Sequence, residues 1–309
     1  LSVHDHLFVG ANTGVAWFRD RPDVIKAHQA FMDGAMRVDI FAIREDGKLD
    51  GRLHAPLRPG VPVLEAGKTY LLDAVIRTVK LGHLFTQGTV DSNEIWLDVT
   101  VRSGDRVIGS SGKLDADREV DPYSHFVNVF LLDVNGYRIS RRNPQDIFTP
   151  LYNHQIPPGA GQTVHYLLEL PDRLDAPVTV ELALKYRKFD KQYTDFIARS
   201  VKKGDLSIRG LDPDSGKLVN ELPITVLATD RLTFPVAGVE AKGSNPASPI
   251  PTWQRWNDYG IGLFLKGDAE YRQAQAAFAE VEALGRFDGP LNLARVLLKA
   301  AEGREAAEA

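Results

Sequence analysis

Histidine is the residue type that offers the clearest chemistry in this sequence. Four of the eight histidines fall among segments with strand and turn character: His83, His125, His154 and His165. A neutral imidazole is the commonest metal ligand in proteins, and a sheet brings distant segments together. We therefore take these four residues as candidate ligands of a transition metal, with His154 and His165 as the pair to test first. None of their spacings matches a metal motif, and the alternative is that each histidine hydrogen-bonds to loop backbone.

A run of acidic residues at alternate positions gives a second candidate site. Its members are Asp115, Asp117, Glu119 and Asp121. In an extended backbone this spacing places all four carboxylates on one face, and carboxylate oxygens are the ligands that calcium prefers. The run is therefore a candidate calcium site. It lacks the glycine and terminal glutamate of an EF-hand, and a solvated acidic turn is the alternative.

Alternation of apolar and polar residues predicts the elements that must position these side chains. Many short segments read as half-buried strands. Turn signals such as Asp46-Gly47 and Asn135-Gly136 separate them. No helical pattern intervenes among the segments up to residue 188, so we expect an antiparallel β-sandwich. Residues 189–206 read as a short helix or loop. The segments with strand character are 37–44, 70–79, 94–101, 106–114, 126–134, 137–141, 165–171, 178–189, 206–211 and 222–232.

The apolar period becomes helical after Thr252. Gly262, Ala274 and Phe278 match the small and aromatic positions of a tetratricopeptide repeat. Any helical hairpin packed on the sandwich is the alternative. We therefore predict a mainly β protein with a C-terminal α part. Its predicted regions are a β-sandwich at 1–237 with a candidate sub-domain split near 190–205, a Gly-, Pro- and Ser-rich linker at 238–251, and tetratricopeptide-like helices at 252–309.

Composition excludes several classes of protein. The chain has 309 residues with 43% hydrophobic content and a net charge of −4, which gives no sign of a nucleic-acid partner. No apolar run is long enough to span a membrane. Cysteine is absent, so the chain has no disulfide, no zinc–thiolate site and no C-x-x-C-H motif for covalent haem. Phosphate-binding loops, nucleophile elbows and H-E-x-x-H are also absent, so no motif predicts a reaction.

Several phrases of the sequence are distinctive: FVGANTGVA, RTVKLGHLFTQGTVDSNEIWLDV, DPYSHFVNVFLLD, RRNPQDIFTPLYNHQIPPGAG and WNDYGIGLFLKGD. Together they resemble the C-terminal, non-haem portion of bacterial multihaem c-type cytochromes that carry tetratricopeptide repeats. The resemblance covers the chain from about Phe8 to Gly303. It implies export to the periplasm or the cell exterior, and a partner that is a haem-bearing segment or cytochrome subunit. His4 and His6 are then candidate axial ligands of a haem held by a neighbouring segment.

Three functions are compatible with these patterns. The leading hypothesis is a non-catalytic module for assembly or docking in a multihaem electron-transfer protein, with the helices contacting other proteins. The second is a metal-dependent oxidoreductase or hydrolase built on the histidines. The third is a carbohydrate- or protein-binding sandwich, for which Trp17 and Trp96 are the candidate exposed aromatic residues. We expect the chain to be either a processed product or a piece of a longer protein.

Overall fold

The computed structural model describes residues 9–86, 90–201, 208–212, 214–216, 218–240 and 244–308. Its strands are β1 (Met36–Glu45), β2 (Leu53–His54), β3 (Thr69–Thr78), β4 (Glu94–Ser103), β5 (Arg106–Ser111), β6 (Val129–Leu132), β7 (Thr149–Asn153), β8 (Gly161–Glu169), β9 (Val178–Arg187) and β10 (Ile224–Phe234). Its helices are α1 (Thr13–Phe18), α2 (Pro22–Met32), α3 (Lys191–Ser200), α4 (Thr252–Phe264), α5 (Tyr271–Ala283) and α6 (Asp288–Glu308), with short 3-10 helices η1 (Pro144–Asp146) and η2 (Asp268–Glu270).

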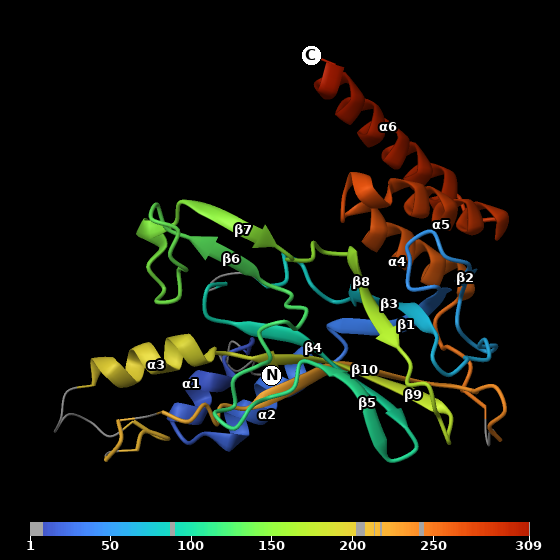
Figure 1. The fold of residues 1–309 in the computed structure, drawn as a ribbon. Helices are drawn as coiled ribbons and strands as arrows, with labels where there is room; N and C mark the ends of the chain where they lie inside the picture. Colours follow the sequence, from blue (N-terminus) through green and yellow to red (C-terminus); the bar gives the residue numbers. More distant parts are fainter. Residues whose placement is uncertain are drawn as a thin grey trace, which may run out of the picture.

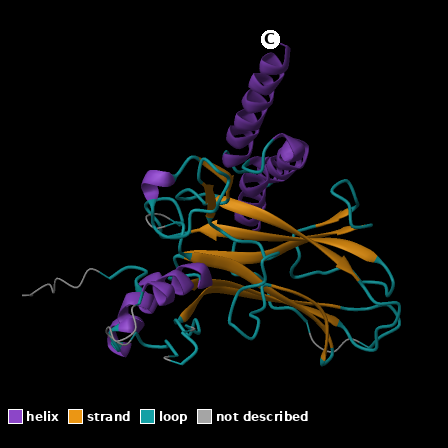
Figure 2. Cartoon of the chain, turned by 60° about the vertical axis from the view of Figure 1, so that its left-hand side comes forward, coloured by secondary structure: helices purple, strands orange, loops and turns teal. Residues whose placement is uncertain are grey.

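Two four-stranded antiparallel sheets share one hydrophobic core. The strand orders are β2-β1-β3-β8, which we call the first sheet, and β10-β9-β4-β5, the second sheet. Along β9, Val178, Val180, Leu182 and Leu184 are buried and the residues between them are half-buried, as a period of two requires. These side chains share a core with those of β1, β3 and β8. The sheets are therefore stacked face to face, in the manner of a β-sandwich (Figure 2).

The first sheet is a middle layer, because helices cover its other face. Phe41 on β1 stacks on Tyr259 of α4 with ring centroids 4.4 Å apart. Val75 of β3 and Phe278 of α5 belong to the same apolar cluster. In Figure 1, α4 and α5 lie against this sheet and α6 projects away. The prediction of a mainly antiparallel β protein with a C-terminal helical part is confirmed, while the tetratricopeptide assignment stays a prediction.

Buried ion pairs also connect α4 to the two large sheets. Arg255 of α4 donates to the Asp39 carboxylate of β1 at 2.7 and 2.9 Å. Arg58 lies 3.3 Å from the same carboxylate and also pairs with Asp230 of β10. The side chains of Arg255, Asp39 and Arg58 are each less than 10% exposed. Since removing one partner leaves an uncompensated buried charge, this chain of alternating charges holds the three elements in one arrangement.

Several local features differ from the strand predictions. Residues 13–32 form helices α1 and α2, for which no element was predicted. Segment 137–141 is not a strand and makes only an isolated bridge between Arg138 and Leu132. Residues 149–153 form β7 instead, which pairs with β6 in a separate two-stranded sheet. The proposed division of the chain into regions stays a prediction.

Candidate functional site

Three of the four predicted metal-binding histidines line one cleft of about 530 Å³. His125 lies before β6, His154 follows β7 and His165 lies on β8. Lys266, after the end of α4, closes the cleft on the helical side. The fourth histidine, His83, is exposed outside this cleft, and its Nδ1 lies 2.9 Å from the carbonyl oxygen of Leu84. The sequence therefore named three of the residues that line the cleft but could not separate His83 from them.

The ring of His154 is held by stacking and by one hydrogen bond. It lies between the rings of Tyr152 and His125, with centroid distances of 4.6 and 5.1 Å. Its Nδ1 lies 3.1 Å from the carbonyl oxygen of Phe126. A carbonyl oxygen only accepts, so Nδ1 carries a proton, and Nε2 is the ring nitrogen that could bind a metal. This is the orientation that metal-binding histidines adopt, with the second ring nitrogen donating to the protein.

His125 is a neutral imidazole. Its Nε2 lies 2.9 Å from Oε1 of Gln162, to which it donates. Burial lowers the pKa of His125 to about 4, an effect that the bond to Gln162 opposes and the neighbouring His154 reinforces. The His125 ring therefore places no positive charge at this end of the cleft at neutral pH.

His165 is bound on both sides by carboxylates. Its Nδ1 lies 2.7 Å from Oδ1 of Asp73, and its Nε2 lies 2.9 and 3.1 Å from the two oxygens of Glu270. Burial alone would lower the pKa of His165, but the hydrogen bonds to Asp73 and Glu270 outweigh it and raise the pKa. Both ring nitrogens are engaged, so this histidine offers no lone pair to a metal.

The structure corrects the geometry expected for the acidic run. The chain reverses there: Asp115 N donates to Glu119 O at 3.0 Å, and Arg118 has a positive φ of 60°. Asp115 Oδ1 accepts from Glu119 N at 2.8 Å, and Asp121 Oδ1 accepts from Tyr123 N at 3.0 Å. The prediction that Asp117 and the other three carboxylates share one face of an extended segment is therefore wrong.

Among the residues that the structure describes, no group of three or more His, Asp or Glu side chains is arranged to hold a metal ion. The transition-metal site and the calcium site stay predictions. The candidate haem ligands His4 and His6 lie outside the described residues. The two tryptophans considered for ligand binding are buried: Trp17 is 8% exposed and Trp96 is 0% exposed, so neither presents a ring surface to a sugar.

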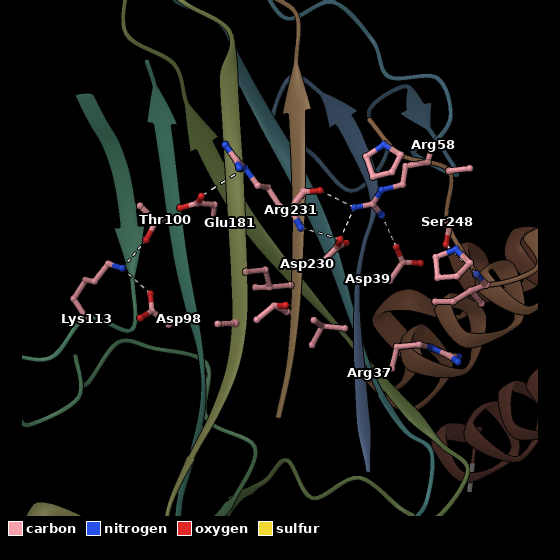
Figure 3. A pocket seen from close by; sticks show the side chains of 18 residues that line it. Arg37, Asp39, Arg58, Asp98, Thr100, Lys113, Glu181, Asp230, Arg231 and Ser248 are labelled. Carbon is pink, nitrogen blue, oxygen red and sulfur yellow. Dashed lines mark hydrogen bonds and ion pairs between the residues drawn. The ribbon is translucent and has the colours of Figure 1, made fainter. Parts of the chain in front are cut away.

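A larger cleft, of about 680 Å³, lies across the outer face of the second sheet. Figure 3 shows that most of its labelled charged side chains pair with one another. Lys113 lies 2.8 Å from Asp98, and Arg231 lies 3.6 Å from Glu181. Arg58 pairs with both Asp230 and Asp39, whereas Arg37 pairs with Asp258 outside the cleft. No sequence motif marked this cleft, because its residues come from strands far apart in the chain.

Within the described ranges, no helix combines the length and apolar composition that a membrane span needs.

No family model matches the chain, and no curated protein matches it. Among solved structures, the penta-heme cytochrome c552 from Thermochromatium tepidum is similar at 14% identity and a TM-score of 0.40. The match covers 67% of this chain and 41% of that one, so the chain spans less than half of that cytochrome, and a likeness of this size carries no argument about function.

Proposed function

We propose that this chain is a non-catalytic docking module for a haem-bearing cytochrome segment or subunit, acting in the periplasm or outside the cell. The observation that carries the proposal is the orientation of His154. Its Nδ1 proton is committed to the carbonyl of Phe126, which leaves Nε2 as the nitrogen that would coordinate a metal, and the residue lines the cleft. The sequence resemblance supplies the kind of partner. The chain has no cysteine, so it carries no covalent c-type haem of its own.

The residues around His154 fit a haem iron with an open axial position. Imidazole is a common axial ligand of haem iron. The flanking rings of Tyr152 and His125 fix the plane of His154, which reduces the entropy lost on coordination. His125 is uncharged, so it adds no cationic repulsion toward a ferric centre. The bound group would supply electron transfer, and this chain would supply the ligand and the docking surface.

An apolar arm beside the cleft supports a docking role. The arm is residues 129–153, which contain β6 and β7 and project from the two large sheets (Figure 1). Its exposed apolar side chains include Val134, Tyr137, Phe148 and Leu151, which are 64–74% exposed. Clustered exposed apolar side chains mark protein-interaction surfaces. Tyr152 of the same arm lines the cleft, so a partner seated on the arm would reach His154.

The coordination step is tested with a probe: a c-type haem peptide whose sixth axial position is open. Adding the purified chain should convert the Soret and visible bands of the ferric peptide to the low-spin form. His154→Ala should abolish this conversion, while His83→Ala, which removes an exposed histidine outside the cleft, should preserve it. The proposal fails if the wild-type chain leaves the spectrum unchanged, or if His154→Ala converts the peptide as well as the wild type does.

The docking step, for a partner that is a separate subunit, is tested on the protein as isolated from its source. Its visible spectrum should show c-type haem that co-purifies with this chain in a fixed ratio. Phe148→Ser together with Leu151→Ser should reduce that ratio. Val226→Ser, a matched change at a 52% exposed residue of β10, should not. A preparation without haem absorbance would contradict the proposed partner.

A further inference from the structure

We propose that His165 is a pH-sensitive clamp that holds the helices α4 and α5 on the first sheet. His165 lies on β8, in that sheet, and bridges two carboxylates from different layers. Asp73 lies on the adjacent strand β3, and Glu270 ends η2, directly before α5. The hydrogen bonds of 2.7 Å to Asp73 and 2.9 Å to Glu270 therefore connect sheet and helices through one imidazole.

The sheet side of the clamp is a fully buried polar cluster. Asp73 is 0% exposed, and its second oxygen accepts from the hydroxyl of Tyr259 of α4 at 2.6 Å. Arg44 of β1 donates to that hydroxyl at 2.8 Å, and its Nε lies 3.4 Å from Asp73. These contacts hold the Asp73 side chain so that its Oδ1 faces His165 as a hydrogen-bond acceptor.

On the helical side, Glu270 is also paired with a lysine. Lys266, between α4 and η2, lies 2.9 Å from Glu270. The hydrogen bonds from His165 and Lys266 outweigh the effect of burial and lower the pKa of Glu270. Glu270 therefore stays ionised at neutral pH. The charged groups that face His165 are thus two carboxylates and two cations, Arg44 and Lys266, so the clamp depends on its hydrogen bonds and not on a charge excess.

Only the protonated form of His165 satisfies this geometry. Both ring nitrogens face carboxylate oxygens, which accept but cannot donate when ionised. The imidazolium donates to both, whereas the neutral ring must point one lone pair at a carboxylate. Because the pKa of His165 is raised by folding, the clamp is fully present below the ordinary histidine pKa of about 6.5 and is lost as pH rises through the folded-state value.

The test is hydrogen–deuterium exchange of the whole chain over a pH series, corrected for the intrinsic exchange rate. Amides of α4 and α5 should lose protection as pH rises through the pKa of His165, by about tenfold for each unit by which that pKa exceeds 6.5. The same pKa is read from the NMR titration of the imidazole C–H signals in the wild-type chain. His165→Gln should remove the pH dependence.

Two further variants separate a clamp from general destabilisation. Glu270→Gln should lower the pKa of His165 and move the loss of protection to lower pH. His54→Gln removes a histidine that pairs with Glu45 at 2.7 Å within the first sheet, and it should leave the protection profile of α4 and α5 unchanged. The clamp is refuted if the NMR titration of His165 lies at or below 6.5, or if His165→Gln keeps the wild-type profile. If His165→Gln does not fold, the wild-type titration and the shift in Glu270→Gln decide.

Discussion

Replacing Gly262 by alanine tests the contact between α4 and the first sheet. Alanine at an exposed helix position normally stabilises by about 1 kcal/mol relative to glycine. Here the helix lies directly on β8. A Cβ at residue 262 would overlap Oγ1 of Thr163, lie 2.6 Å from its backbone nitrogen and lie 2.9 Å from the carbonyl carbon of Gln162. Backbone atoms cannot rotate away, so α4 must move off the strand.

The net cost follows from these two opposing terms. Forcing an extra carbon into a packed contact costs about 1–3 kcal/mol and sometimes more. After the gain of about 1 kcal/mol in helix propensity is subtracted, we expect Gly262→Ala to lower the free energy of unfolding by up to about 2 kcal/mol. Urea unfolding measures this, with the fluorescence of Trp253 and Trp256 on the same helix as the signal. The midpoint should fall while the slope stays unchanged.

Gly303→Ala is the matched control. Gly303 also lies in a helix, α6, but its added Cβ would have its nearest neighbour, Asp268 Oδ2, 3.8 Å away. This variant should be neutral or more stable by up to about 1 kcal/mol. If Gly262→Ala unfolds at a higher urea concentration than the wild type, as Gly303→Ala is expected to do, the close approach of α4 to β8 is refuted.

Three other changes should give distinct results. Arg255→Met leaves the Asp39 carboxylate buried with one cation fewer and should cost about 3–5 kcal/mol in urea unfolding. Because folding lowers the pKa of His125 to about 4, its contribution is present above pH 6.5 and lost as pH falls toward 4. Roughly 3 kcal/mol of the free energy of unfolding should be lost over that range. This loss should be smaller in His125→Gln and the same as in the wild type in His83→Gln. Urea midpoints at each pH measure it. Asp190→Ala removes the N-cap of α3 and should cost about 1 kcal/mol or more; Asp190→Asn, which keeps a capping oxygen, should recover part of that loss in thermal unfolding.

The long strands could be predicted because their apolar content is high and turn residues bound them. The predicted segments 37–44 and 94–101 correspond to β1 (Met36–Glu45) and β4 (Glu94–Ser103). The helical start at Thr252 was also predicted, since the apolar spacing changes there from two to three or four residues. Both signals come from residues that are close together in the sequence, and the elements that they predict are kept when the chain packs.

Other elements could not be obtained from the apolar pattern. The start of α2 has Pro22 at the first helical position and Asp23 in the first turn, which is a helix-start signal, but α2 buries only His28 and Met32 and so has a weak apolar face. β7 contains Pro150, which argues against a strand. It is tolerated because β7 pairs on one side only, with β6.

The histidines of the candidate site could be predicted from the sequence, but the residues that they contact could not. The partners of His165 are 92 and 105 residues away in the chain, and no spacing rule connects positions so distant. The choice between the two geometries of the acidic run could not be made for a related reason. The calcium hypothesis assumed an extended backbone, whereas the carboxylate of Asp115 accepts from the backbone of its own turn, as in the alternative of an acidic turn.

The position of the first sheet between two layers limits how this protein can be divided for experiments. Its helix-facing side carries Asp39, Asp73 and Arg44, which are nearly inaccessible when α4 is present. A fragment that stopped at residue 251 would expose these charges together with the ring of Phe41 to water. Such a fragment would be prone to aggregate, so binding studies with a shortened chain should retain at least α4 and α5.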